Sequence, residues 1–124
     1  MKMAMRTIIV EDSDIVQRIL IEELGRIQGV EVCGMTGDTQ DAVRMILETT
    51  PDLVILDIVL CNGNGFEVLK KIRKEGSDCF VIVLTNHPYH HYREISKELG
   101  ADLFFDKTIE FEKAIEAVRT MACN

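Results

Sequence analysis

Five polar residues that lie at or just beyond the ends of short apolar runs could form one chemical site. They are Glu11, Asp12, Asp57, Thr85 and Lys107. Carboxylates held close together repel one another, and their hard oxygen atoms suit Mg²⁺, which often pairs with phosphate. A carboxylate is a weak nucleophile, but it can attack phosphorus when cations neutralise the charge on the phosphoryl oxygens. If the fold brings these residues together, they could bind Mg²⁺ and accept a phosphoryl group.

Each residue would have its own role in that chemistry. Asp57 emerges directly from the apolar run Leu53–Leu56 and is the candidate nucleophile. The Lys107 ammonium would neutralise phosphoryl charge, and the Thr85 hydroxyl would donate a hydrogen bond. Taken singly, each residue also has an ordinary structural explanation, such as capping of a helix by Asp12 or Ser13. The chemical interpretation therefore depends on the elements that position these residues.

Five short apolar runs are the candidate strands of this chain. They are rich in Val, Ile, Leu and Phe, and several are apolar on successive residues, which is typical of strands buried on both faces of a parallel sheet. The runs are Thr7–Val10, Val30–Met35, Leu53–Leu56, Phe80–Leu84 and Leu103–Phe105.

Each apolar run is followed by a stretch with apolar residues at helical spacing. These stretches cover residues 16–27, 42–49, 66–72, 95–99 and 111–122, and the fourth is the weakest. Gly76 and Gly100 stand where helices should end. Glu110 and Glu112 fall in the expected first turn of the last helix, where negative charge complements the helix dipole.

The alternation of strand and helix, repeated five times, predicts an α/β fold. Right-handed crossovers then give a doubly wound, five-stranded parallel sheet with helices on both faces. In such a sheet, functional groups gather beyond the carboxyl ends of the strands, where the strand order reverses. This is where the five polar residues should meet. We expect one domain over residues 1–124, with no effector domain.

Composition restricts the location and partners of this chain. The net charge of −7 disfavours binding to nucleic acids and to anionic membranes. There is no signal peptide and no apolar run of membrane-spanning length. The four cysteines form no Cys-x-x-Cys pair, so we expect reduced thiols in a cytoplasmic protein. They are Cys33, Cys61, Cys79 and Cys123.

Four segments resemble the receiver domains of bacterial two-component response regulators. They are IIVEDSDIV, PDLVILDIVLCNGNGFEVLKKIR, VIVLTNHP and GADLFFDK. The resemblance covers nearly the whole chain and implies the flavodoxin-like receiver fold with strand order 2-1-3-4-5. It also implies that Glu11, Asp12, Asp57 and the Val59 backbone carbonyl hold Mg²⁺, and that Asp57 is the phosphoacceptor.

The resemblance further implies a conformational switch. Lys107 corresponds to the lysine that contacts the phosphoryl group, and Thr85 to the hydroxyl that moves toward it. Phe104 corresponds to the aromatic residue that turns inward on activation, and Gly65 to the glycine of the loop that follows the acceptor.

Several positions depart from the family pattern. Glu11 stands where aspartate is commoner, and Phe104 lacks the hydroxyl of the common tyrosine, which disfavours an outward ring. Cys61 replaces a usual proline four residues after the acceptor, so the loop could be less rigid. Thr108 replaces the proline after the lysine, which puts the cis peptide bond expected there in doubt.

The predicted function is that of a phosphoprotein switch in bacterial signalling, and not that of an enzyme. A histidine kinase or a histidine phosphotransfer protein would phosphorylate it, and the output would be binding to another protein, as a monomer or as a phosphorylation-dependent dimer. A receiver-like interaction module that works without phosphorylation is the alternative. An aspartyl-phosphate phosphatase of the haloacid dehalogenase type is disfavoured, because Val59 stands where the general acid would be.

Two further patterns have weaker functional interpretations. His87 and His91 have the spacing of a helical metal pair, but Pro88 disfavours a continuous helix between them. The stretch Gly63–Gly65 lacks the rest of a nucleotide-binding motif and is interpreted as a turn. Tyr92 and Arg93 lie on the fourth predicted helix, which many receivers use as an output surface.

Overall fold

The computed structural model describes residues 4–123 and has a five-stranded parallel sheet. The strands of this sheet are β1 (Met5–Val10), β2 (Val30–Thr36), β3 (Leu53–Leu56), β6 (Phe80–Thr85) and β7 (Leu103–Asp106). The helices are α1 (Asp14–Gly25), α2 (Thr39–Thr49), α3 (Gly65–Lys74), α4 (His90–Glu98) and α5 (Phe111–Cys123). The strand order is β2-β1-β3-β6-β7, which confirms the predicted doubly wound order.

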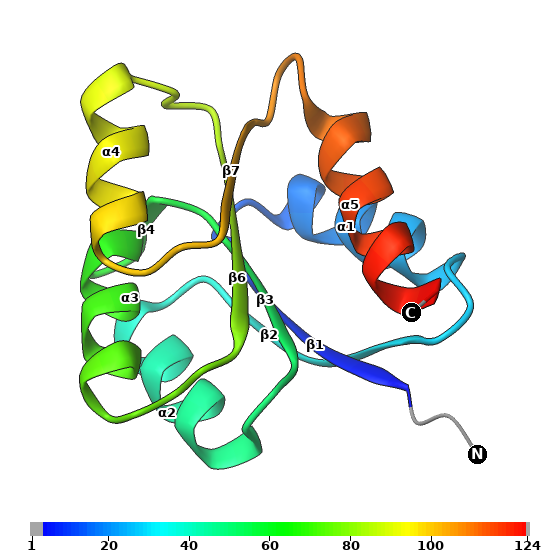
Figure 1. The fold of residues 1–124 in the computed structure, drawn as a ribbon, viewed down its shortest axis with the longest axis horizontal. Helices are drawn as coiled ribbons and strands as arrows, with labels where there is room; N and C mark the ends of the chain where they lie inside the picture. Colours follow the sequence, from blue (N-terminus) through cyan, green and yellow to red (C-terminus); the bar gives the residue numbers. More distant parts are fainter. Residues whose placement is uncertain (1–3, 124) are drawn as a thin grey trace.

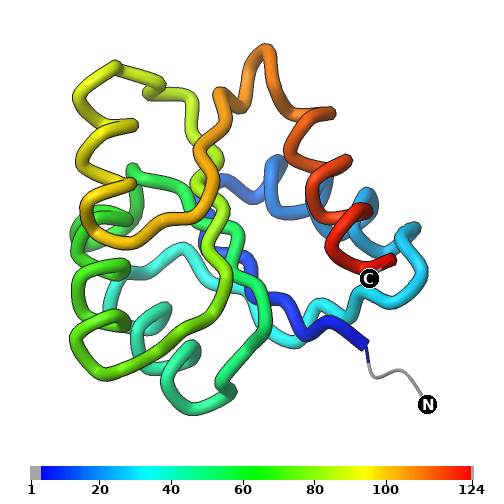
Figure 2. Tube along the Cα trace, viewed as in Figure 1, coloured from blue at the N-terminus to red at the C-terminus, as the bar shows by residue number. Residues whose placement is uncertain are grey.

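Helices cover both faces of the sheet. Helices α1 and α5 lie on one face, and α2, α3 and α4 lie on the other (Figure 1). After β1 and β7 the chain runs to α1 and α5 on one face, and after β2, β3 and β6 it runs to α2, α3 and α4 on the other (Figure 2). This arrangement puts an apolar layer on each side of the central strands.

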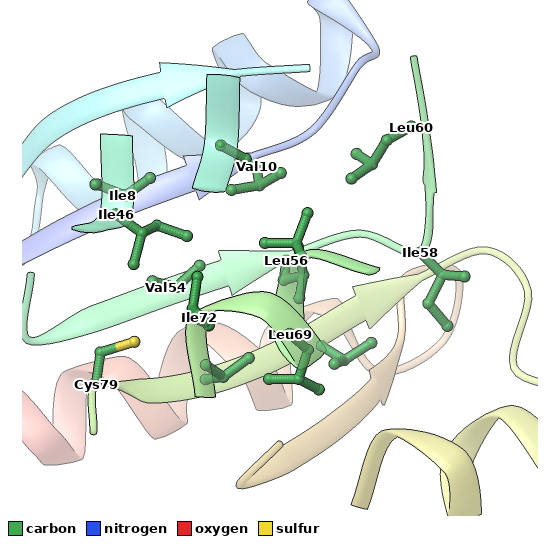
Figure 3. Packing of buried hydrophobic residues seen from close by; sticks show 14 of the residues in the cluster. Ile8, Val10, Ile46, Val54, Leu56, Ile58, Leu60, Leu69, Ile72 and Cys79 are labelled. Atoms are coloured by element: carbon green, nitrogen blue, oxygen red, sulfur yellow. The ribbon is translucent and has the colours of Figure 1, made fainter. Parts of the chain in front are cut away.

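The central strands are apolar on successive residues because both of their faces are buried. In β1, Ile8 and Val10 point into the cluster beneath α2 and α3, while Ile9 packs against the α1 and α5 side. Figure 3 shows the first of these clusters, with Ile46 of α2 and Ile72 of α3 directed at the sheet. The alternation explains why these strands read as continuous apolar runs.

Glycines end two helices as predicted. Gly76 and Gly100 have φ angles of 88° and 102°, values that favour glycine because it has no β-carbon. Ser13 caps α1, with its side-chain oxygen accepting from Val16 N at 3.3 Å. The capping interpretation of Ser13 is therefore confirmed.

The structure also contains an element that the sequence did not predict. A short antiparallel hairpin follows Asp57 and consists of β4 (Val59–Leu60) and β5 (Gly63–Asn64). The predicted turn is thus partly wrong, because Gly63 pairs with Leu60 and Asn64 caps α3 by accepting from Glu67 N. The turn itself includes Asn62, whose φ of 61° is left-handed.

The sheet reverses its strand order between β1 and β3. Strand β2 lies beyond β1 on one side, while β3, β6 and β7 lie on the other. Val10 pairs with Leu56 in the β1–β3 register, so both strands end at the same edge. The residues that follow them, Glu11 and Asp57, are therefore neighbours across the point of reversal.

Candidate functional site

Three carboxylates meet at the carboxyl edge of the sheet. Asp57 N donates to Val10 O at 2.9 Å, which continues the β1–β3 pairing one step past the strands. Glu11, Asp12 and Asp57 each offer a carboxylate oxygen, and these oxygens lie within 4.8 Å of one another. Glu11 is 3% and Asp57 6% exposed, whereas Asp12 is open to solvent. The predicted convergence of these three residues is confirmed.

Lys107 reaches the same place from the other half of the chain. Its backbone N–H donates to Thr85 O at 2.9 Å, which holds the end of β7 beside the end of β6. Its Nζ atom lies 2.5 Å from Glu11 Oε1 and 3.0 Å from Asp57 Oδ2. One ammonium group therefore joins two buried carboxylates.

The electrostatics of this cluster are unbalanced. Burial, and then the charge of Asp57, raise the pKa of Glu11 above its usual value although Lys107 opposes the shift. Burial works against the Lys107 ammonium, but its contacts with Glu11 and Asp57 outweigh this and raise the pKa of Lys107. With Asp12 nearby, the carboxylates outnumber the ammonium, so an additional cation would relieve their repulsion.

Backbone groups orient the buried carboxylates. Ser13 N donates to Glu11 Oε2 at 3.0 Å, and Ile58 N donates to Asp57 Oδ1 at 2.7 Å. Gly65 N donates to Ile58 O at 2.7 Å, and a β-carbon on Gly65 would lie only 2.3 Å from Asp57 O. The close approach explains why a glycine begins α3 at this position.

Thr85 and Phe104 are both buried, and no hydrogen bond among the described residues joins the Thr85 hydroxyl to a carboxylate of the cluster. The Thr85 side-chain oxygen accepts from His87 N at 3.1 Å. The Phe104 ring is 9% exposed, and the Arg93 guanidinium carbon lies 4.6 Å from its centre. Arg93 Nη1 also donates to Phe104 O at 3.0 Å, so α4 and β7 are joined at this ring.

Residues 7–119 match the family described as the response regulator receiver domain. The chain belongs to this family.

Relatives of this receiver domain include two proteins of Bacillus subtilis. The probable C4-dicarboxylate response regulator DctR is 27% identical over 113 residues, which are 91% of this chain and 50% of DctR. The transcriptional regulatory protein LiaR is 30% identical over 114 residues, which are 92% of this chain and 54% of LiaR. The receiver domain thus spans about half the length of these relatives.

Solved structures agree with the fold. A two-component response regulator of the LuxR family from Aurantimonas superposes with a TM-score of 0.88 at 25% identity, covering 97% of this chain and 86% of that one. The receiver domain of the putative response regulator NarL from Mycobacterium tuberculosis also gives 0.88, at 20% identity, with 98% of each chain covered.

The residues of this receiver domain suit a magnesium ion. In the part of the chain that the structure describes, Glu11, Asp12 and Asp57 are the only group of three His, Cys, Asp or Glu residues placed closely enough to hold a metal. Carboxylate oxygens are the ligands Mg²⁺ prefers. His87 and His91 are not part of such a group, and α4 begins only at His90, so the helical histidine pair does not form.

Two departures from the family pattern have visible consequences. Every described peptide bond is trans, including the one before Thr108, whose N–H donates to Asp106 Oδ1 at 2.8 Å. Cys61 N donates to Gly37 O at 2.9 Å, a hydrogen bond that proline could not make. No sequence pattern could indicate this contact, because both groups belong to the backbone of separate loops.

No described helix of the receiver domain combines the length and the apolar character that crossing a bilayer requires.

Proposed function

We propose that this receiver domain accepts a phosphoryl group on Asp57 in a Mg²⁺-dependent reaction and thereby switches binding to another protein. The main support is the contact of the 6%-exposed Asp57 with Lys107 Nζ at 3.0 Å, inside a cluster of three carboxylates. A nucleophile beside a fixed cation is what phosphoryl transfer to a carboxylate requires.

The phosphodonor would be a phosphohistidine of a histidine kinase or of a phosphotransfer protein. An Asp57 carboxylate oxygen forms the new bond to phosphorus while the phosphorus–nitrogen bond of the donor breaks. The electron pair of the broken bond stays on the imidazole nitrogen, which takes up a proton. Lys107 neutralises charge on the phosphoryl oxygens during this step, and the Ile58 N–H keeps the Asp57 carboxylate oriented.

Mg²⁺ would be held by Glu11, Asp12, Asp57 and the Val59 carbonyl. When bound, the ion supplies positive charge to the transferring phosphoryl group. Asp12 is exposed at the mouth of the cluster, so the ion can enter from solvent. Glu11 is buried against Lys107, which suits a residue that sets the charge and shape of the site.

The switch would involve Thr85 and Phe104. The Thr85 hydroxyl can keep accepting from His87 N while it donates its proton to a phosphoryl oxygen. Movement of Thr85 would disturb the β6–α4 loop and, through Arg93, the contact between α4 and Phe104. The output surface would then be α4 and its neighbours, read by a protein partner in the cytoplasm, with the receiver domain acting as a monomer or as a phosphorylation-dependent dimer. Beyond accepting this group and slowly losing it, the domain would catalyse no reaction.

Intact-protein mass spectrometry after incubation with acetyl phosphate and Mg²⁺ tests this function. We expect a mass gain of one phosphoryl group, absent without Mg²⁺ and absent in Asp57→Asn. Asp52→Asn is the matched control, since Asp52 lies at the other end of β3 and should leave the gain unchanged. If the wild-type protein gains no mass with acetyl phosphate or with phosphorylated kinases, a module that works without phosphorylation becomes the better account.

A further inference from the structure

Four hydrogen bonds join the loop after Asp57 to the loop between β2 and α2. Cys61 N donates to Gly37 O at 2.9 Å, and Thr39 donates to Cys61 O through both its N and its Oγ1 atoms at 3.1 Å each. Asn62 Nδ2 donates to Asp38 Oδ1 at 2.6 Å. We term these five residues the loop clip.

One end of the loop clip packs against the backbone of Glu11 and Asp12. Glu11 N donates to Thr36 O at 2.9 Å, immediately before Gly37. A β-carbon on Gly37 would lie 2.6 Å from Asp12 Cα and 2.9 Å from Asp12 Cβ. The loop between β2 and α2 therefore packs directly against Asp12, and any movement of this loop moves the surroundings of that carboxylate.

The other end of the loop clip holds the hairpin that contains Val59. Val59 pairs with Asn64 and Leu60 with Gly63, and the Leu60 side chain is 7% exposed within the core cluster (Figure 3). A backbone carbonyl cannot adjust by changing a rotamer, so its position depends on how its loop is anchored. For the Val59 carbonyl, that anchoring comes from the hairpin and from the loop clip.

The loop clip is itself attached to a packed helix. Asp38 caps α2, with Oδ2 accepting from Asp41 N at 2.9 Å while Oδ1 accepts from Asn62. The hydrogen bond from Asp41 N, and then the one from Asn62, lower the pKa of Asp38. The Asp38 carboxylate therefore stays ionised as an acceptor. Helix α2 is anchored by Ala42 and Ile46, which are buried in the core.

We propose that the loop clip is a positioning element that holds the Val59 carbonyl at a set separation from Asp12 and thereby determines the affinity of the site for Mg²⁺. This inference rests on the proposed function, since it assigns Asp12 and Val59 to the same ion. It adds residues on the β2–α2 loop, which carries none of the reactive side chains, to those that shape the site.

Two substitutions weaken the loop clip with little change of shape. Asn62→Gly removes the contact with Asp38 and tolerates the left-handed φ of 61° at this position, and Thr39→Val removes the hydroxyl contact with Cys61 at nearly constant volume. Thr49→Val is the matched control, because it makes the same chemical change at the far end of α2, where Thr49 Oγ1 donates to Met45 O at 2.7 Å.

Isothermal titration calorimetry with Mg²⁺ alone measures the affinity of each variant. In the double variant we expect the dissociation constant for Mg²⁺ to rise about 10-fold. For Thr49→Val it should stay within about twofold of the wild-type value. Hydrogen exchange in the metal-free protein should show faster exchange of the Cys61 amide in the double variant, and thermal unfolding should show that all variants are folded.

An unchanged dissociation constant in the double variant, together with faster exchange at Cys61, would overturn the proposal. A weakened affinity in Thr49→Val equal to that in Thr39→Val would overturn it as well, because it would indicate a general loss of stability. A different result would contradict the proposed function itself: wild-type protein that binds no Mg²⁺ or gains no phosphoryl group. Should the double variant not fold, Asn62→Gly alone decides, since the backbone hydrogen bonds of the loop clip remain.

Discussion

The two edges of the same sheet use charged residues in opposite ways. At the amino edge, Asp52 Oδ2 accepts from Arg6 N, and Asp102 Oδ2 accepts from Val81 N, each at 2.8 Å. Arg73 donates to Gly100 O at 2.7 Å and reaches Asp102 at 3.4 Å. At the carboxyl edge, Glu11 and Asp57 are buried and share Lys107.

The difference separates carboxylates that stabilise the fold from carboxylates that are arranged to bind a ligand. At the amino edge, Asp52 and Asp102 each accept a hydrogen bond from the backbone N–H of a neighbouring strand and remain exposed to water. These carboxylates therefore stabilise the loops between elements. At the carboxyl edge, carboxylates are crowded and withdrawn from water, which costs stability unless a cation is added. Among residues 4–123, this unfavourable arrangement occurs at one edge alone, where the strand order reverses.

Replacing Lys107 should have the largest effect on this contrast. Lys107→Met leaves Glu11 and Asp57 buried without their ammonium, and we expect a loss of about 3 kcal/mol of unfolding free energy without metal. Phosphorylation by acetyl phosphate should slow at least ~100-fold. Urea denaturation with and without Mg²⁺ measures the unfolding free energy, and added Mg²⁺ should restore part of the lost stability. Equal stability of variant and wild type would show that the ammonium is dispensable to the cluster.

Replacing Asp102 at the amino edge should affect stability alone. Asp102→Ala removes the acceptor of Val81 N and one partner of Arg73, so we expect a cost of about 1–3 kcal/mol. The dissociation constant for Mg²⁺ should remain within about twofold of the wild-type value, since distant sites are additive. A marked change in Mg²⁺ affinity would mean that the two edges are coupled, contrary to the contrast drawn above.

Neutralising Glu11 should have a smaller effect on stability than the two substitutions above. This effect should depend on pH and should be stabilising instead of destabilising. Because the folded protein raises the pKa of Glu11, its ionised form is disfavoured, and the penalty grows as pH rises through the unfolded and then the folded pKa. Glu11→Gln should therefore raise the melting temperature of the metal-free protein by roughly 2–4 °C at neutral pH. The gain should vanish at acidic pH, where Glu11 is protonated in both states. Thermal unfolding across this range checks the sign, and a constant difference at all pH values would contradict it.

Most of the sheet could be predicted from sequence because its strands are buried on both faces. Leu53–Leu56 has the predicted bounds, and the other strands differ only at their ends, as β6 does by including Thr85. The hairpin of Val59–Asn64 could not be predicted, since its strands have two residues each and carry no periodic pattern. Its pairing depends on backbone groups that every residue possesses.

The candidate site could be predicted to the level of which residues meet. The rule that strand ends converge at the reversal point placed Asp57 beside Glu11 and Lys107. The sequence could not show that Lys107 lies closer to Glu11 than to Asp57, or that the Thr85 hydroxyl is held by His87. These details follow from side-chain packing in three dimensions.

Titration of isotope-labelled protein with Mg²⁺, followed by the amide chemical shifts in NMR, tests the central claim most directly. We predict saturable shifts at residues 11–13, 57–59 and 107, and negligible shifts at Asp52 and Asp102 on the opposite edge. Shifts that do not saturate, or that are as large at the amino edge as at the carboxyl edge, would contradict the assignment of the three carboxylates to a magnesium site.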